Sequence, residues 1–362
     1  MDHADAHRHR EVLHLNPLST MKIVLRHIFL LFSAAALLLP MASCVDEEEF
    51  DNNQRGNFEA LWKLLDEHYC FFSYKKQVYG LDWNEVHARY SAKVTDSLTT
   101  LNFFDLMAQM TAELRDGHVN LYSDFDTGRY WSWHENYPSN VSDTLLRRYL
   151  GTDYRMAGGM KYRTLADSVG YIRLESFTTS PTNATINDVL LLLSACKGLI
   201  IDLRDNGGGL MTAAQNLAEH FADSTRIVGY MRHKTGKGHN DFSPMEPQTI
   251  RPSGGVRWLR PTILLTNRSV YSAANEFVKY MKCFPQVIVV GDSTGGGAGM
   301  PFSGELPNGW AVRFSACPMY DKQGRDTEFG IAPDYQVGLL DADVSRGKDT
   351  LIDFACGLIM KK

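Results

Sequence analysis

Short apolar runs alternate along most of the chain with segments in which apolar residues recur at helical spacing. A run such as 198–201, bounded by a turn signal, is typical of a strand buried on both faces, whereas a 3.6-residue period predicts an amphipathic helix. Strands are expected at 169–177, 198–201, 227–232, 261–267 and 287–290, and helices at 186–195, 211–221, 272–284 and 349–360. Strands that alternate with helices predict an α/β layer fold.

Between residues 56 and 116 the pattern predicts helices and no strands. Helices are expected there at 57–69, 82–90 and 103–114. In the first of them Phe58, Leu61 and Leu65 share one face, together with an aromatic stripe that we interpret as core rather than as a ligand platform. The pattern predicts an N-terminal helical bundle over 56–116, followed by an α/β core over 117–362.

The beginning of the chain has the pattern of a secretory signal. Lys22 and Arg26 form a short positive region ahead of the apolar run 28–39, which is too short to span a membrane. The following Met41-Ala42-Ser43-Cys44 resembles a bacterial lipobox. The resemblance implies a lipid on Cys44 and a place in the bacterial cell envelope, facing the periplasm or the cell surface. Ordinary cleavage nearby is the alternative.

Two segments beside the signal are not assigned to the fold. We interpret residues 1–20 as an over-extended gene start ahead of Met21, so that 1–44 comprises this start and the lipoprotein signal peptide. Residues 45–55, with an acidic run at 46–49, are interpreted as a solvated tether.

Composition restricts the classes of function. The 362-residue chain is 44% hydrophobic with a formal net charge of −5, which suits one large or two modest globular domains and gives no indication of a nucleic acid partner. The cysteines after Cys44 are Cys70, Cys196, Cys283, Cys317 and Cys356. Because they are scattered, they predict neither a metal site nor a disulfide framework, although one disulfide is left open. We expect no metal and no cofactor.

The strand at 198–201 leads into a glycine turn. Gly207, Gly208 and Gly209 follow a polar cluster and precede a predicted helix. Backbone amides at such a turn can face a ligand, and glycine lets an anion approach closely. A tight turn without a ligand is the alternative.

Two residues at element boundaries are candidates for catalysis. His118 follows a helix end at Asp116-Gly117 and begins a strand, where it is either a base or an ordinary histidine. Ser272 lies between a buried strand and a helix, where it is either a nucleophile or a helix N-cap. The aromatic segment 123–161 either lines a substrate groove or packs as a hairpin.

Four segments in order resemble the tail-specific, or C-terminal-processing, serine protease family, whose relatives include the tricorn protease core and the interphotoreceptor retinoid-binding proteins. The segments are LRDGHVNL, GLIIDLRDNGGG, LLTNRSVYSAANEF with VVGDSTGGGAG, and EFGIAPDYQV. The resemblance implies a ClpP/crotonase-like core of ββα units behind a leading helical bundle. The stretch between Leu121 and Tyr171 is too short for the PDZ domain that is usual in the family.

The resemblance also implies the site residues. The nucleophile of the family falls on Ser272, the histidine of its tricorn-like branch on His118, and a glutamate of that branch on Glu328. A serine needs a base within hydrogen-bond reach, a histidine can serve near neutral pH, and a carboxylate can hold the tautomer of that histidine.

The same mapping gives the oxyanion hole and two departures from the family pattern. The amides of Gly207, Gly208 and Ala273 are expected to face the developing oxyanion. The lysine base of the bacterial processing branch is replaced by Gly297, and the serine that precedes the histidine in the tricorn branch is replaced by Gly117. The chain therefore resembles a histidine-using variant that lacks part of that relay.

Lysine bases are less well placed in the sequence. Lys279 and Lys282 lie at least seven residues beyond Ser272 on the same predicted helix, about 10 Å or more along its axis. Lys322, in a predicted loop, stays open as an alternative base.

The resulting interpretation is a serine endopeptidase that acts on peptides or unfolded protein ends outside the cytoplasm, attached to the membrane by its lipid. A carboxylate partner such as Glu328 would raise the pKa of His118 toward 7. The alternative is a non-catalytic lipoprotein that binds peptides or hydrophobic ligands in the same groove, which the two departures favour; a non-peptide acyl hydrolase is a third option. The oligomeric state is left open.

Overall fold

Residues 49–361 are described by a computed structural model, in which residues 50–361 belong to one compact unit. The predicted signal segment, Cys44 and the start of the predicted tether lie outside the described residues. The helices that open the described part are α2 (Gln54–His68), α3 (Phe72–Tyr79), α4 (Trp83–Ser91) and α5 (Thr100–Ala112). Helix α2 begins where Asn53 accepts a hydrogen bond from the Gly56 amide, at 2.8 Å.

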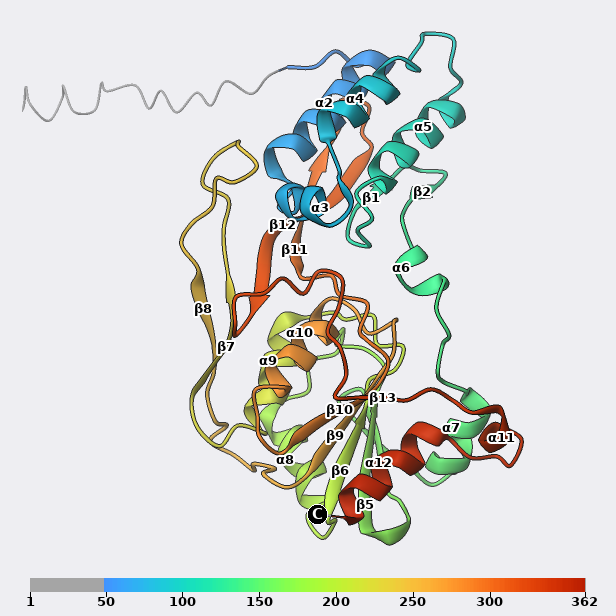
Figure 1. Ribbon diagram of the computed structural model, residues 1–362, viewed down its shortest axis with the longest axis vertical. Helices are drawn as coiled ribbons and strands as arrows, with labels where there is room; N and C mark the ends of the chain where they lie inside the picture. Colours follow the sequence, from blue (N-terminus) through green and yellow to red (C-terminus); the bar gives the residue numbers. More distant parts are fainter. Residues whose placement is uncertain (1–48, 362) are drawn as a thin grey trace, which may run out of the picture. The chain divides into compact units, whose positions relative to one another are not determined.

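The larger sheet of the described residues has seven strands (Figure 1). In order across the sheet these are β13 (Tyr335–Gln336), β10 (Val287–Gly291), β9 (Thr262–Thr266), β6 (Gly198–Asp202), β5 (Val169–Leu174), β4 (Met160–Thr164) and β3 (Arg155–Ala157). The first five run parallel, and β4 and β3 are antiparallel additions at one edge. Every residue of β5, β6 and β9 is buried, which explains why these strands are almost continuously apolar.

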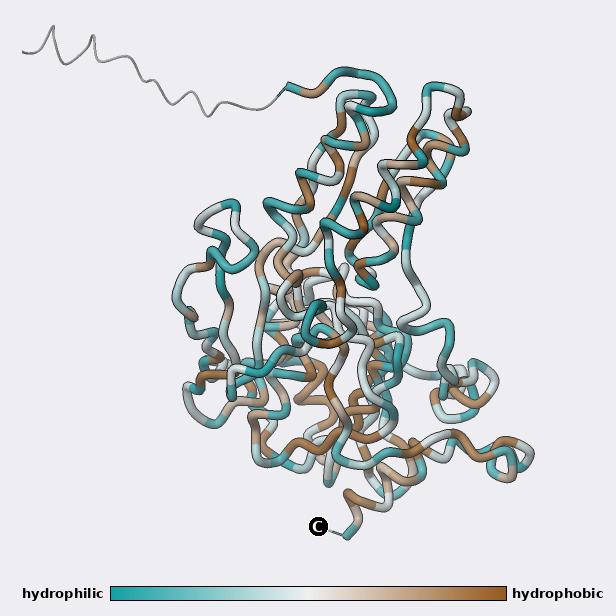
Figure 2. The backbone as a smooth tube through the Cα atoms, turned by 45° about the horizontal axis from the view of Figure 1, so that its top comes forward, coloured by the Kyte–Doolittle hydropathy of each residue, from teal (hydrophilic) through white to brown (hydrophobic). Residues whose placement is uncertain are grey.

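Helices cover both faces of this sheet. Leu199 and Ile201 face the core formed by α8 (Asn183–Leu192), α9 (Met211–Glu219) and α10 (Ala273–Met281). Ile200 between them faces α7 (Asp143–Leu150) and α12 (Thr350–Met360), because successive side chains of a strand point to opposite faces. The hydrophobic segments in Figure 2 gather in this region of the molecule. The predicted α/β layer fold is confirmed.

A second, antiparallel sheet joins the N-terminal helices to the rest of the unit. Its strands are β2 (Thr127–Gly128), β1 (Asn120–Tyr122), β12 (Ala311–Asp321), β7 (Arg226–Met231) and β8 (Glu246–Ile250), with β11 (Gly299–Glu305) paired to β12. Phe58 of α2 and Met107 of α5 share one buried cluster with Leu121 and Phe314 of this sheet. The helices therefore pack on strands from the far end of the chain rather than on one another alone.

The remaining short elements connect these layers. They are α6 (Ser132–Glu135), the 3₁₀ turn η1 (Ala166–Ser168) and α11 (Asp341–Val344). Within residues 49–361, none of the helices is both long enough and apolar enough to cross a bilayer.

Candidate active site

The structure brings Ser272 and His118 into direct contact. The Oγ of Ser272 lies 3.0 Å from the Nε2 of His118, although 154 positions separate the two residues in the chain. Ser272 follows β9 and immediately precedes α10, while His118 lies between α5 and β1. The pair is therefore assembled from the two sheets, and its distance is within the range for a nucleophile and its base.

Ser272 does not cap the helix that it precedes. Its side chain makes no capping hydrogen bond to α10, and its backbone has φ +56° and ψ −125°, an unfavourable conformation for a residue with a Cβ. A hydrogen bond of 2.9 Å from its amide to the carbonyl of Gly296 holds this conformation. The turn thus directs the hydroxyl toward His118 instead of toward the helix.

His118 is buried and held from one side of its backbone. Its amide donates to Oδ1 of Asp116 at 2.7 Å, and its ring contacts the ring of Tyr271 edge-on, with the centroids 4.9 Å apart. A neutral ring that accepts from Ser272 carries its proton on Nδ1. Nδ1 is buried and has no hydrogen-bond partner among the described residues, although the backbone of Gly299 is one of the groups that favour a proton on the ring.

Burial lowers the pKa of His118 to about 4, because a charged imidazolium would lose its hydration there. The carboxylate of Asp116 opposes this shift, whereas the charges of Arg313 and Lys75 add to it. The expectation of a pKa near 7 is therefore wrong: desolvation of the ring outweighs the neighbouring carboxylate.

Glu328 is buried close by, but it does not hydrogen-bond to His118. Its Oε1 accepts from the ammonium of Lys75 at 3.3 Å, and its Oε2 accepts from the amide of Ala298 at 3.0 Å. Burial, and then the charge of Asp116, raises the pKa of Glu328 well above its usual value. The described residues thus place the partner of the Glu328 carboxylate on α3, not on the histidine ring.

Lys75 is the residue that the sequence analysis overlooked. Its side chain is fully buried, and its ammonium donates to the carbonyls of Leu114 at 2.5 Å and Arg115 at 3.3 Å. It also lies 3.9 Å from Oδ2 of Asp116 and bonds to Glu328 as described. In the sequence FSYKKQVY a lysine at this position has the appearance of a solvent-facing helix residue, so no signal marked it.

Asp116 is the second overlooked residue, although it stands in the motif that contains His118. Its carboxylate accepts from the hydroxyls of Tyr69 and Ser315, both at 2.9 Å, and from that of Tyr271 at 3.3 Å. Against the cost of burial, the charge of Lys75, the neighbouring His118 with its amide and the Ser315 hydroxyl keep the pKa of Asp116 below the usual range. Asp116 is therefore an anion fixed beside the backbone of His118.

The glycine turn lies against the serine. A Cβ on Gly208 would come within 2.9 Å of both the Cβ of Ser272 and the amide nitrogen of Ala273, so only glycine fits there. The amide of Gly208 donates to Oδ1 of Asn206 at 2.9 Å. Among the described residues, no group accepts from the amide of Gly207 or from that of Ala273.

Aromatic rings occupy the space that side chains would need at the two positions where glycine departs from the family pattern. A Cβ on Gly297, whose φ is +74°, would lie 2.4 Å from the ring of Tyr271. A Cβ on Gly117 would lie 2.5 Å from Nε1 of Trp133 on α6, and that indole stacks on Tyr271 with the centroids 4.0 Å apart. The two glycines are required by this packing.

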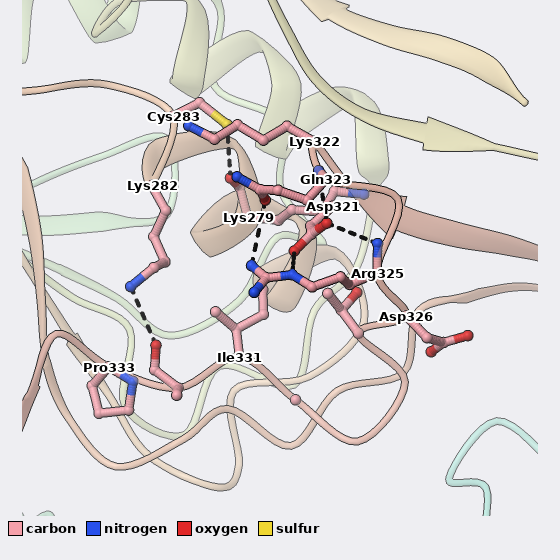
Figure 3. Close-up of a pocket in the computed structure, with 13 residues that line it drawn as sticks. Lys279, Lys282, Cys283, Asp321, Lys322, Gln323, Arg325, Asp326, Ile331 and Pro333 are labelled. Carbon is pink, nitrogen blue, oxygen red and sulfur yellow. Dashed lines mark hydrogen bonds and ion pairs between the residues drawn. The ribbon is translucent and has the colours of Figure 1, made fainter. Parts of the chain in front are cut away.

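The lysines considered as alternative bases lie elsewhere. Lys279, Lys282 and Lys322 line a cavity of about 650 Å³ beside the C-terminal half of α10, and neither Ser272 nor His118 lines it (Figure 3). Lys279 is paired with Glu276 on its own helix, and Lys282 bonds to Asp334 at 2.6 Å. The described contacts therefore leave His118 as the candidate base in reach of the serine.

Family models match two parts of the chain. The model of peptidase family S41 matches residues 168–337, and that of the tricorn protease C1 domain matches residues 50–112. The first region contains the strand-to-helix turns of the glycines and of Ser272, and the second contains α2 to α5.

Solved structures are similar over most of the chain. A crystal structure from Parabacteroides merdae, assigned as a peptidase, is 48% identical over 85% of this chain and 97% of its own, with a TM-score of 0.81. Mature CPAF in complex with lactacystin has a TM-score of 0.66 over 86% of this chain and 99% of its own, and at 13% identity it supports the fold alone.

Curated relatives are similar over about half of the chain. The carboxy-terminal-processing protease of Bartonella bacilliformis is 27% identical over 184 residues, which are 49% of this chain and 40% of that protein. The chloroplastic C-terminal processing peptidase of Tetradesmus obliquus is 26% identical over 172 residues, 47% of this chain and 35% of its own. The match thus spans two fifths or less of each relative.

Proposed function

Because the chain belongs to peptidase family S41, we propose that it is a serine endopeptidase that cleaves peptides or unfolded protein ends, with Ser272 as nucleophile and His118 as base. The observation that carries this proposal is the 3.0 Å contact between Ser272 Oγ and His118 Nε2 at a strained strand-to-helix turn. The buried, neutral ring can accept the hydroxyl proton without first losing one of its own.

The first chemical step follows from this contact. The Oγ of Ser272 attacks the scissile carbonyl while Nε2 of His118 takes the hydroxyl proton, and the imidazolium then gives that proton to the leaving amine. The fixed carboxylate of Asp116 favours the transient positive charge on the ring. In the second half of the reaction, water attacks the acyl-serine ester while Nε2 of His118 takes a proton from it. The imidazolium then returns the proton to Oγ of Ser272 as the ester bond breaks and the acid product leaves.

The oxyanion of the tetrahedral intermediate would be bound by backbone amides. Gly207 and Ala273 are the better donors of the three expected ones, because the amide of Gly208 is already bonded to Asn206. In this proposal Gly208 serves by its lack of a Cβ, which lets the turn approach the serine. Glu328 acts through Lys75 rather than on His118 directly.

The substrate class and the cellular location are also proposed. The names of the relatives describe processing at carboxyl termini, which supports peptide or protein ends as substrates. The lipobox-like sequence supports attachment through Cys44 to the bacterial cell envelope. The alternative of a non-catalytic binding protein is not favoured, because the reactive serine geometry has no use in passive binding.

The test is covalent labelling together with proteolysis. A fluorophosphonate probe should label the wild type and not Ser272→Ala, and only the wild type should degrade a reduced, unfolded protein. His118→Ala should fold, since it removes a side chain without leaving a charge, and should lose both activities by about 10²-fold or more. Labelling that persists in Ser272→Ala would assign the nucleophile to another residue.

A further inference from the structure

A fully buried lysine from the N-terminal helices contacts the turn that leads to the catalytic histidine. Lys75 of α3 is unexposed, and its three N–H donors have three acceptors: the carbonyls of Leu114 and Arg115 and Oε1 of Glu328. A buried ammonium is costly unless it is paired and fully hydrogen-bonded, and this site supplies both conditions. The satisfied donors also exclude a role of Lys75 as a base for the serine.

We propose that Lys75 is a positioning residue of the active site, which holds the turn that aims His118 at Ser272 and supplies the positive charge behind it. The inference rests on the proposed serine peptidase function and adds a residue from the helical region 50–112 to its site.

The first support is the backbone of the turn. Arg115 has φ +47°, a conformation that a residue with a side chain adopts only at a free-energy cost. The Lys75 ammonium donates to the carbonyl of Arg115 itself and to that of Leu114, the residue before it. The next residue, Asp116, then accepts from the amide of His118. Without Lys75, the turn loses the contacts that offset its strain.

The second support is electrostatic. Lys75 lies between the carboxylates of Asp116 and Glu328, at 3.9 and 3.3 Å. Among the described residues, the charged groups around Lys75 and His118 include Asp116, Glu328, Asp326 and Arg313. Asp326, which also lines the cavity of Figure 3, belongs to this set because the charges of Lys75 and Asp116 act on its carboxylate. Lys75 is thus the cation that keeps this acidic cluster compatible with a neutral His118.

The experiment compares Lys75→Met, Lys75→Arg and the wild type in hydrolysis of an unfolded protein substrate across pH. We expect Lys75→Met to lower kcat by about tenfold to a hundredfold with little change in KM, because positioning is lost and substrate contacts are not. Its acid limb should move to higher pH, since a positive charge that lowers the pKa of His118 is gone while the His118 amide and the Ser315 hydroxyl still donate to Asp116. Lys75→Arg should restore part of the rate and the position of the limb.

Lys279→Met is the matched control. Lys279 is also a buried lysine with an acidic partner, Glu276, but it makes no contact with the site residues. A merely structural loss should lower Tm in both methionine variants and leave the acid limb of each at its wild-type position. Should Lys75→Met not fold, Lys75→Gln, which keeps a donor toward Leu114, replaces it in the same measurements.

The outcomes separate this inference from the proposed function. An unchanged kcat and acid limb in Lys75→Met, or a loss of rate that only follows its Tm, overturns the role of Lys75. Activity that survives in Ser272→Ala overturns the peptidase mechanism itself. An inactive Ser272→Ala beside a Lys75→Met with wild-type kinetics removes Lys75 from the site and leaves the serine mechanism intact.

Discussion

The ring of Tyr271 fills the space that a side chain at position 297 would need, with a hypothetical Cβ of Gly297 only 2.4 Å from the ring. Tyr271 immediately precedes Ser272, donates a hydrogen bond from its hydroxyl to Asp116 and contacts the ring of His118. The choice between a lysine base and a histidine base is therefore also a choice of packing. Where the processing branch has a lysine, this chain has an aromatic ring that supports the histidine.

Gly297→Lys should not create a serine–lysine enzyme. The substitution introduces a Cβ into Tyr271 and places a non-glycine residue at φ +74°, so we expect a loss of at least about 1–3 kcal/mol in the free energy of unfolding. Urea unfolding followed by tryptophan fluorescence measures this loss. Gly309→Lys is a matched control, because that glycine has a similar φ of +83° but nothing near its Cβ. Full stability and higher activity of Gly297→Lys would contradict the packing argument.

Activity should persist to unusually low pH. His118 accepts a proton only when neutral, and burial lowers its pKa to about 4, so kcat/KM should stay level from pH 7 to about 5 and fall through about 4. The free energy of unfolding should fall with pH in the same direction as the rate. The lowered pKa of His118 contributes fully to stability above its usual pKa of about 6.5, and that contribution decreases as pH falls toward 4. Tm measured at each pH separates titration from unfolding. A half-maximal rate between pH 6 and 7 in a folded enzyme would show that substrate binding or solvent restores the ordinary pKa.

Asn206→Ala should weaken the oxyanion site without touching the serine or the histidine. The buried Asn206 side chain accepts from the amide of Gly208 and donates to the carbonyl of Leu174 at 3.0 Å, and it thereby fixes the glycine turn. We expect kcat to fall by about tenfold to a hundredfold, less than or equal to the loss of an oxyanion donor itself. Steady-state kinetics measures the change, with Asn216→Ala of α9 as a control that lies outside the turn. Wild-type kcat in a folded Asn206→Ala would mean that the turn does not bind the oxyanion.

Cys44→Ala should release the protein from the membrane fraction. The lipobox-like sequence before Cys44 predicts a thioether-linked lipid, and a lipid chain contributes about 0.8 kcal/mol of membrane affinity per buried CH₂. Metabolic labelling with a radioactive fatty acid, followed by fractionation, tests this directly. Cys356→Ala, which removes a cysteine near the other end of the chain, should keep both label and attachment. An unlabelled wild type that still sediments with membranes would require a different anchor.

The sequence by itself determined the alternation of strands and helices and the positions of the candidate nucleophile and base. Burial on both faces requires continuous apolar strands, and the residues before and after Ser272 could form only a strand and a helix. His118 and Ser272 each stand at an element boundary, which left an ordinary histidine and a helix N-cap as alternatives, and the resemblance of four segments to the family singled them out. The strands, the helices and their boundaries are local features, so each is specified by the residues of its own short segment.

The tertiary structure alone decided what surrounds that pair. In the sequence, α3 is a short segment of mixed aromatic and polar residues, and nothing local marks Lys75 as buried. Its burial results from packing against the loop before β1. That cation takes the Glu328 carboxylate that the resemblance had assigned to the histidine. The pKa of His118 likewise depends on how much water the folded chain excludes from the ring. Charge pairing and desolvation are set by distances between residues remote in sequence, and no local pattern encodes them.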